Sequence, residues 1–294
     1  MKQPIFLGSC TAMVTPFGQH GIDYSRFAKH IDFQASENTN AILISGTTGE
    51  NATQSFEEHC ALLRFAAEYN NGRMKLIAGI GANNTMTALE YGKLAEDVGY
   101  DGVLMVTPYY NKTTQKGLIE HFTYVADRIR VPMILYNVPS RTGIGITAET
   151  YKILSEHPNI NGIKEASGDF SLFSKVRCQC RDSLYIWCGN DDQTVPMMAL
   201  GAKGVISVAS NIIPGVISKL CQLCLDGNFY AAEQLHLEYG ELFSDLFLET
   251  NPIPVKTAMN LMGMEAGSFR LPLIPMQQKN EDTLKAQLRK HKLV

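Results

Sequence analysis

A lysine stands in an otherwise apolar run that resembles a buried strand, in the sequence Gly-Ile-Lys-Glu-Ala-Ser at residues 162–167. An ammonium group is costly to remove from water, so lysines rarely enter such strands. Where one does, burial favours the neutral amine, which can attack a ketone to form a Schiff base. The alternative is a structural lysine that reaches solvent or pairs with the adjacent Glu165. Strand alternation puts Lys164 and Glu165 on opposite faces, which argues against that pair but leaves catalysis and structure both open.

Polar residues also follow three other apolar runs. Residues 46–50 read Gly-Thr-Thr-Gly-Glu. This is either a turn whose hydroxyls and backbone N–H groups receive a carboxylate or a plain turn before a helix. Residues 107–111 (Thr-Pro-Tyr-Tyr-Asn) and 135–141 (Leu-Tyr-Asn-Val-Pro-Ser-Arg) carry tyrosines. A phenol beside a protonated imine could shuttle protons while the imine draws electrons away to leave an enamine. Packing is the commoner role of such a tyrosine, so neither segment decides the chemistry alone.

The elements that must position these residues are short apolar runs, each followed by a turn and a helical pattern. They begin roughly 20 to 35 residues apart, the spacing of βαβ units, at residues 9–14, 41–45, 75–80, 102–106, 133–137, 162–164, 183–187 and 204–208. Continuous apolar strands indicate a parallel sheet covered on both faces. Eight such units predict an α/β fold, a (β/α)8 TIM barrel, whose active site lies at the carboxyl ends of the strands.

The alternative fold is a doubly wound open sheet, but residues 79–84 lack the third glycine of a dinucleotide-binding loop. No phosphate-binding P-loop or nucleophile elbow is present either. A barrel takes about 250 residues, so we expect additional C-terminal helices at residues 228–248, 253–262 and 281–291. The predicted division is a catalytic barrel at residues 1–225 and a helical extension, packed on it, at residues 226–294.

Composition narrows the class of protein. The 294 residues are 45% hydrophobic with a formal net charge of -3. The sequence has no concentrated cluster of basic residues, which argues against a nucleic-acid partner. The apolar stretch within residues 4–14 is too short for a secretion signal, no run is long enough to cross a membrane, and we interpret residues 9–14 as the first strand. Seven cysteines, an odd number in a chain too long to need disulfides, favour the reducing cytoplasm. Cys221 and Cys224 have metal-ligand spacing, but without a second pair or a histidine cluster they predict two reduced thiols and no metal site.

Collinear motifs match a known family. They are Val-Thr-Pro-Phe at 14–17, the turn at 46–50, Ile-Ala-Gly at 77–79, Val-Thr-Pro-Tyr-Tyr-Asn at 106–111, Tyr-Asn-Val-Pro-Ser-Arg-Thr-Gly at 136–143, Gly-Ile-Lys-Glu-Ala at 162–166, Gly-Val-Ile-Ser at 204–207, Asn-Pro-Ile-Pro-Val-Lys at 251–256 and Leu-Pro-Leu at 271–273. From about residue 8 to residue 273 the sequence resembles the dihydrodipicolinate synthase family of pyruvate-dependent lyases and aldolases. Members condense pyruvate with L-aspartate 4-semialdehyde, releasing water, in the diaminopimelate route to lysine.

The resemblance implies roles for the catalytic positions. Lys164 would form the imine with pyruvate, and that covalent imine replaces any cofactor. Tyr136 would act as general acid and base, with Thr47 and Tyr110 completing a hydrogen-bonded relay to solvent. In the family the residue matching Tyr110 reaches in from a neighbouring subunit, which implies a homo-oligomer, usually a tetramer built as a dimer of dimers.

The same resemblance implies the substrate contacts. Thr48 and the N–H groups of its turn would hold the pyruvate carboxylate. Arg141 would grip the carboxylate of aspartate semialdehyde with two bonds, as a planar guanidinium can. Backbone groups of Gly189 and Ile206 would complete the site.

Related activities share part of this set. N-acetylneuraminate lyases and keto-deoxy sugar acid aldolases have the same barrel, the lysine and the tyrosine, so Lys164 and Tyr136 indicate only a Schiff-base pyruvate enzyme. Arg141 and the paired threonines favour the synthase. A barrel that has lost its chemistry and only binds ligands is disfavoured, because every expected catalytic position is filled.

Some family members are inhibited by lysine, which binds at a subunit interface. The matching positions here are Asn51, Ala52, Phe56, His59, Asn83, Thr87 and Tyr109. Lysine-inhibited enterobacterial members have a histidine where this chain has Phe56 and a glutamate where it has Thr87. The missing carboxylate removes a charge-assisted contact to the lysine ammonium. We therefore expect a degenerate site and weak or absent feedback inhibition.

Overall fold

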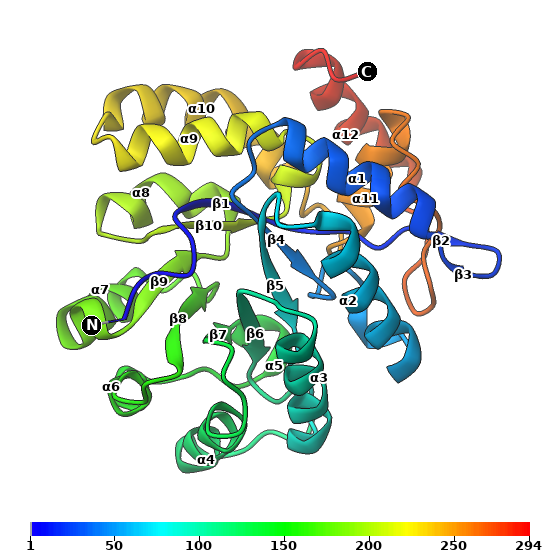
Figure 1. Cartoon of the computed structure of the whole chain (residues 1–294). Coiled ribbons are helices and arrows are strands. Elements are labelled where there is room, and N and C mark those ends of the chain that lie inside the picture. The colour runs from blue at the N-terminus through cyan, green and yellow to red at the C-terminus, as the bar shows by residue number, and fades with distance from the viewer. Residues whose placement is uncertain (1) are drawn as a thin grey trace.

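A closed barrel of parallel strands forms the centre of the computed structural model, which describes residues 2–294 (Figure 1). Around the barrel the strands follow the order β1-β10-β9-β8-β7-β6-β5-β4. Their bounds are β1 Gly8–Ala12, β4 Ala41–Ile44, β5 Lys75–Gly79, β6 Gly102–Val106, β7 Met133–Asn137, β8 Ile160–Glu165, β9 Tyr185–Cys188 and β10 Gly204–Ser207. The (β/α)8 prediction is confirmed and the open sheet is excluded, because β1 pairs with both β10 and β4.

Helices follow the strands and surround the barrel. They are α1 Tyr24–Ser36, α2 Phe56–Asn70, α3 Thr85–Asp97, α4 Gln115–Ala126, α5 Pro139–Thr142, α6 Ala148–Ser155, α7 Phe170–Cys180, α8 Thr194–Ala199 and α9 Pro214–Leu225. Polar side chains fix several starting points: Ser55 forms a capping box with Glu58 at α2, and Thr114 caps α4. These caps satisfy N–H groups that the first helical turn leaves unpaired. A short hairpin, β2 (Phe17–Gly18) with β3 (Gly21–Ile22), precedes α1 and was not predicted.

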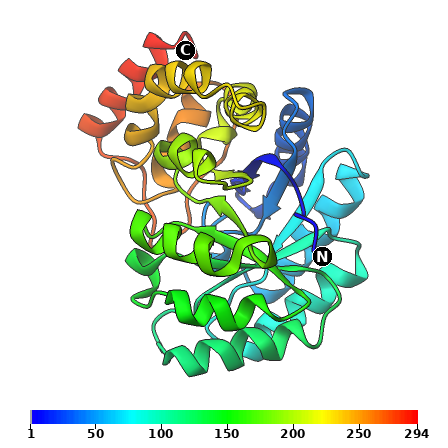
Figure 2. The same ribbon diagram turned by 90° about the vertical axis from the view of Figure 1, so that its left-hand side faces the viewer.

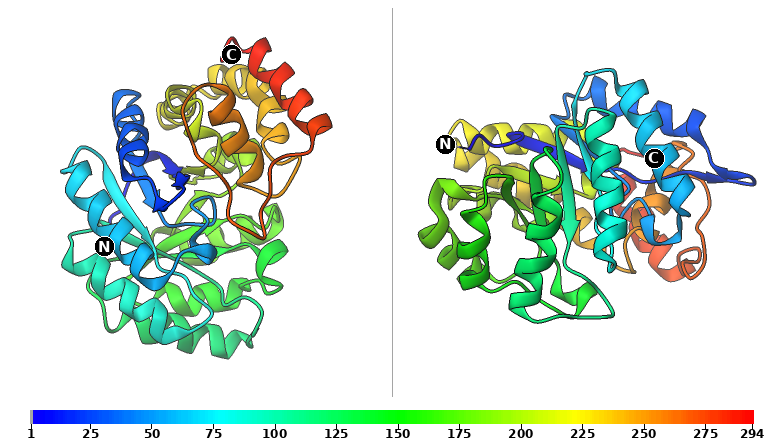
Figure 3. Two further views of the ribbon diagram at one scale, coloured as in Figure 1. Left: turned by 90° about the vertical axis from the view of Figure 1, so that its right-hand side faces the viewer. Right: turned by 60° about the horizontal axis from the view of Figure 1, so that its bottom comes forward.

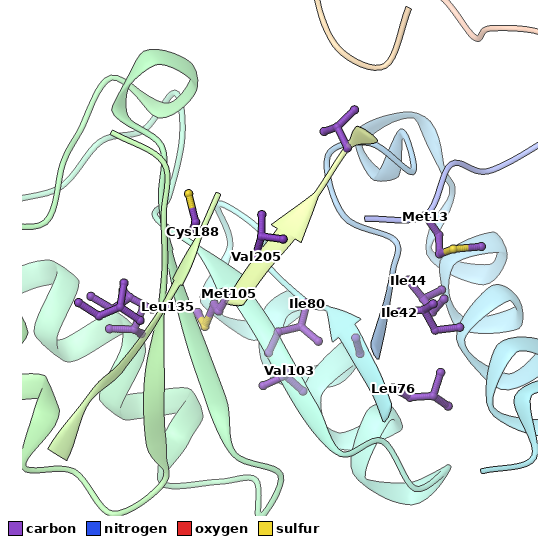
Figure 4. Close-up of a cluster of buried hydrophobic side chains, with 14 of the residues drawn as sticks. Met13, Ile42, Ile44, Leu76, Ile80, Val103, Met105, Leu135, Cys188 and Val205 are labelled. Atoms are coloured by element: carbon purple, nitrogen blue, oxygen red, sulfur yellow. The ribbon is translucent and has the colours of Figure 1, made fainter. Parts of the chain in front are cut away.

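The apolar core has two layers because each strand is buried on both faces. Alternate residues such as Ile42 and Ile44 of β4 lie together on one side of their strand, in the layer between strands and helices (Figure 4). Leu43, the residue between them, belongs to a second cluster inside the barrel, with Leu104 and Trp187. This continuous apolar pattern is the signal that predicts a parallel barrel.

Three helices follow α9, close to the predicted positions: α10 Phe229–Asp245, α11 Ile253–Leu261 and α12 Gln278–Lys290. They gather above one side of the barrel, as the yellow to red part of Figure 2 shows. Helix α10 packs against α9, and α12 packs against both α10 and α11. The division into two parts at residue 225 stays a prediction. No helix in the described residues is long and apolar enough to span a membrane.

The N-terminal segment covers the barrel end that lies opposite the carboxyl ends of the strands. Phe6 is buried and stacks on Trp187, with ring centroids 4.9 Å apart. The Lys2 ammonium donates hydrogen bonds to the carbonyl oxygens of Ser155, Ile160 and Ser183, at 2.8, 2.6 and 3.0 Å. The segment thus closes this end of the barrel with the buried ring of Phe6 and the hydrogen bonds of Lys2.

Replacing Phe6 with alanine should lower the free energy of unfolding by about 3 kcal/mol, because it removes a buried ring and leaves a cavity against Trp187. Urea unfolding followed by circular dichroism measures this change. Leu7→Ala is the matched control, since Leu7 is exposed and its loss should change stability by less than about 0.5 kcal/mol. Equal stabilities for the two variants would show that burial of Phe6 against Trp187 contributes nothing to the free energy of unfolding.

Candidate active site

A cavity of about 190 Å³ opens among the loops that follow the carboxyl ends of the strands. Most of the predicted catalytic and substrate-binding residues line it together: Thr47, Thr48, Tyr136, Arg141, Lys164 and Gly189. Residues far apart in the sequence meet here because every strand of a parallel barrel ends at the same rim.

Lys164 comes from β8 and reaches the floor of this cavity. It is 5% exposed and lies beside Tyr136 of β7 in the strand register. Its Nζ stands 4.5 Å from the centroid of the Tyr136 ring. It forms no hydrogen bond or ion pair with any group of residues 2–294. The amine is therefore available to a ligand in the cavity, with a phenol beside it.

Glu165 does not serve as the partner of this lysine. Its carboxylate accepts hydrogen bonds from Asn137 Nδ2 at 3.1 Å, the Tyr151 hydroxyl at 3.1 Å and the Ser167 N–H at 2.8 Å. Burial raises the pKa of Glu165, and these donors oppose that rise. The two side chains take opposite faces of β8, as strand alternation predicts, and the structural alternative of an ion pair to Glu165 is excluded.

The turn at residues 46–50 contains backbone N–H groups that are unpaired in the described chain and lie beside the cavity. The N–H of Gly49 donates to the Gly46 carbonyl at 3.1 Å, and the N–H of Glu50 donates to the Thr47 carbonyl at 3.0 Å. The N–H groups of Thr47 and Thr48 donate to no other group in the described chain, and both residues line the cavity. Successive free N–H groups in a turn form a binding site for an anion.

Gly189 follows β9 and leaves room for the lysine side chain. A Cβ at this position would stand 2.6 Å from the Ala166 Cβ and 3.2 Å from the Lys164 Cε. Any larger residue would clash with Ala166 and crowd the Lys164 side chain. The requirement for glycine here is therefore steric.

Arg141 lies on α5 at the mouth of the cavity, and a residue of the C-terminal part holds it. Its Nη2 donates to the Asn251 carbonyl at 3.3 Å, while Asn251 Nδ2 donates to the Thr48 hydroxyl at 3.0 Å. Asn251 thus joins the two sides of the cavity, and its buried Oδ1 has no partner among residues 2–294. Sequence reasoning assigned it no role, although it begins the Asn-Pro-Ile-Pro-Val-Lys motif.

A second residue that sequence reasoning missed is Asp191, in the loop after β9. It is buried, and its Oδ2 accepts hydrogen bonds from the N–H groups of Val208 at 3.0 Å and Ala209 at 2.9 Å. Burial raises the pKa of Asp191. The carboxylate fixes the loop after β9 to the loop after β10, next to the cavity wall. The only sequence signal is an acidic residue in a loop at the carboxyl end of a predicted strand.

The structure places two predicted residues away from the cavity lining. Tyr110 has a backbone φ of 67° and a side chain that is 93% exposed. Ile206 of β10 is fully buried in the cluster inside the barrel. Within the described residues no group of three or more His, Cys, Asp or Glu could hold a metal ion.

The sequence matches the Dihydrodipicolinate synthetase family over residues 5–291. The chain belongs to this family. It is 48% identical to 4-hydroxy-tetrahydrodipicolinate synthase 1 of Clostridium acetobutylicum, over 99% of each chain. It is 47% identical to the 4-hydroxy-tetrahydrodipicolinate synthase of Acetivibrio thermocellus over the full length of both. The crystal structure of dihydrodipicolinate synthase from Aquifex aeolicus matches it with a TM-score of 0.96 at 45% identity, over 98% of this chain and 99% of that one. The resemblance noted from the motifs is confirmed.

Two of the positions predicted to match a lysine site, Phe56 and His59, take part in an aromatic stack. His59 stacks on Tyr91 at 3.8 Å between centroids, and Phe56 stacks on Tyr91 at 5.1 Å. The His59 Nε2–H donates to the Gly79 carbonyl at 2.9 Å. Asn83 Nδ2 donates to the carbonyl of Tyr109 at 3.3 Å. Weak or absent lysine feedback in this dihydrodipicolinate synthase family member stays a prediction.

His59 should make the stability of the protein depend on pH. Burial lowers the pKa of His59 to about 4, against about 6.5 in an unfolded chain. The unfolded state therefore binds a proton that the native state excludes, and stability is lost as pH falls from 6.5 through 4. His59→Gln keeps an N–H for Gly79 but does not titrate. Between about pH 7.5 and pH 4 the stability of the wild type should fall by about 3 kcal/mol more than that of the variant. Urea unfolding at both pH values measures this, and parallel losses in the two proteins would refute the assignment.

Proposed function

We propose that this protein is a lyase that condenses pyruvate with L-aspartate 4-semialdehyde through an imine at Lys164, releasing water, in the diaminopimelate route to lysine. The observation that carries the proposal is the uncompensated amine of Lys164 in the cavity, beside the Tyr136 ring. Relatives at 47 to 48% identity that are named 4-hydroxy-tetrahydrodipicolinate synthase support it. We also propose the cytoplasm as its location, where its seven cysteines stay as free thiols.

The first step is formation of the imine. The Lys164 amine attacks the carbonyl carbon of pyruvate, and the new carbon–nitrogen bond forms as the carbonyl oxygen takes a proton. The resulting carbinolamine loses that oxygen as water when a second proton arrives. Tyr136 is the proposed donor and acceptor of these protons, because its ring lies against the Lys164 Nζ. No cofactor is needed, since the protonated imine is itself the electron sink.

The second step forms the carbon–carbon bond. The iminium draws electrons from the methyl carbon, which loses a proton to give an enamine. The enamine carbon attacks the aldehyde carbon of the second substrate, and the aldehyde oxygen takes a proton. The amino group of the bound chain then attacks the imine carbon, which closes the ring and releases Lys164.

Positioning of the two carboxylates follows from the geometry. The unpaired N–H groups of Thr47 and Thr48, with the Thr48 hydroxyl, suit the carboxylate of pyruvate. Arg141 at the mouth suits the carboxylate of the aldehyde, because a guanidinium binds a carboxylate with two parallel bonds. The alternative sugar aldehydes of N-acetylneuraminate lyases and keto-deoxy sugar acid aldolases lack that carboxylate. Arg141 therefore favours aspartate semialdehyde.

The proposal also includes a homotetramer in which Tyr110 of one subunit completes the proton relay of the next. The exposed ring of Tyr110 supports this, because a side chain so exposed contributes little within its own chain. Thr47, which lines the cavity, would connect that ring to Tyr136.

Lys164→Ala should abolish the proposed chemistry. Borohydride reduction in the presence of pyruvate should attach a pyruvate-derived group to the peptide that carries Lys164 in the wild type and to no peptide in the variant. Intact and peptide mass spectrometry detects the adduct, and turnover is compared among aspartate semialdehyde, N-acetylmannosamine and glyceraldehyde. Lys175→Ala is the control, since Lys175 is exposed and pairs with Glu149. Synthase turnover retained in Lys164→Ala would overturn the imine mechanism.

Tyr110→Phe should lose activity about 10²-fold or more if its hydroxyl relays protons. Two inactive variants, Lys164→Ala and Tyr110→Phe, should then regain activity when co-expressed, because some hybrid sites combine an intact lysine with an intact tyrosine from another subunit. Steady-state assays of the purified hybrid test this against mixtures of the separate variants. A hybrid no more active than its parents would show that Tyr110 serves its own chain or none.

A further inference from the structure

A second buried lysine lies outside the cavity and holds together three distant segments. Lys256 of α11 is 0% exposed. Its ammonium donates to Glu50 Oε1 at 2.6 Å, to the Thr15 carbonyl at 3.0 Å and to the Ser268 carbonyl at 2.6 Å. These acceptors belong to the turn after β4, the segment after β1 and the loop between α11 and α12. Figure 3 shows that loop, orange to red, descending from the C-terminal helices toward the barrel.

The ion pair between Lys256 and Glu50 is satisfied but costly. Burial lowers the pKa of Lys256, and the adjacent Glu50 carboxylate opposes that effect. The aromatic faces of Phe17 and Phe269, 4.8 and 5.2 Å from the Nζ, add cation–π attraction. Apolar residues of similar volume often stabilise a core as well as a buried ion pair does. Stability alone therefore does not explain a charged pair at this place, whereas its fixed geometry does.

Glu50 connects this pair to the turn that faces the cavity. Its backbone is left-handed, with φ 54°, a conformation that costs free energy in a residue other than glycine. The N–H of Glu50 bonds to the Thr47 carbonyl at 3.0 Å. Its Oε2 also accepts from the N–H of Arg270 at 3.3 Å. Holding the Glu50 side chain therefore fixes the peptide groups of Thr47 and Thr48, whose N–H groups are unpaired in the described chain.

We propose that Lys256 is a positioning residue for pyruvate: acting through Glu50, it sets the direction of the Thr47 and Thr48 N–H groups that receive the pyruvate carboxylate. The inference rests on the proposed function and extends it. The C-terminal extension is then part of the pyruvate site, although Lys256 touches no substrate.

The binding of the second substrate should depend on this contact far less, because Asn251 connects Arg141 to the Thr48 hydroxyl and not to the Thr48 peptide group. The carboxylate of that substrate is assigned to Arg141, which lies on α5, and neither Lys256 nor Glu50 contacts Arg141 through a hydrogen bond or ion pair in the described chain. Loss of the Lys256 contact should consequently raise the KM for pyruvate and leave the KM for the aldehyde unchanged. Loss of overall folding would change both constants, or the amount of active enzyme.

The test uses the isosteric double variant Lys256→Met with Glu50→Gln, which removes both charges and leaves no unpaired carboxylate. We expect it to fold and to show a KM for pyruvate about tenfold higher, the loss expected when hydrogen bonds to a charged carboxylate are misaligned. The aldehyde KM and kcat should stay within about twofold, as for loss of uniform binding. Lys2→Met is the matched control, because Lys2 also donates to three carbonyl oxygens but at the opposite end of the barrel. It should lower thermal stability without changing either KM.

A second variant keeps the test decisive if the double variant does not fold. Glu50→Gln alone keeps an amide oxygen that can accept from the Lys256 ammonium or the Arg270 N–H, but it removes the carboxylate that binds both of them. It should raise the pyruvate KM about threefold, again without changing the aldehyde KM. A pyruvate KM within about 1.5-fold of the wild type in every folded variant would overturn the proposal. Borohydride trapping of the wild type is run alongside: no adduct there would reject the proposed function, whereas an adduct with unchanged KM values rejects only the role of Lys256.

Discussion

The candidate site depends on one buried amine that forms no hydrogen bond or ion pair with the described residues. Lys164 projects from β8 into the floor of the cavity and is 5% exposed. The nearest candidate partner in sequence, Glu165, is turned to the other face of β8 and occupied by three donors. Asp191, in the loop after β9, accepts two backbone N–H groups at Oδ2, and its Oδ1 forms no hydrogen bond with Lys164 or with any other group of residues 2–294. Both carboxylates therefore stabilise the rim and leave the amine unpaired.

The fold, and the meeting of most candidate site residues at one cavity, could be predicted from the sequence because their signals are local. Apolar runs at βαβ spacing predict the barrel, and alternation within β8 predicts that the Lys164 and Glu165 side chains lie on opposite faces of the strand. Asn251, Asp191 and the pair of Lys256 with Glu50 were missed, since their partners lie far away in the sequence. No local pattern records which loop a buried polar residue will meet.

The placement of Tyr110 and Ile206 shows a further limit. Both sit in motifs that match the family, yet neither lines the cavity in a single chain. Motif matching identifies a position, but it does not say whether a side chain, a backbone group or a neighbouring subunit acts there. The 93% exposure of Tyr110 is information that only the folded chain supplies.

A comparison of three lysines explains why only one is expected to react. Lys2 and Lys256 each donate to three oxygen atoms, so the N–H groups of both ammonium groups are engaged by the protein. Lys164 is nearly as buried as Lys256, but no oxygen within residues 2–294 accepts a hydrogen bond from it. A lysine whose N–H groups are all engaged is held in place by its acceptors, whereas one without acceptors is free to bind a ligand. The supply of acceptors, more than the depth of burial, therefore distinguishes the structural Lys256 from Lys164, the proposed nucleophile.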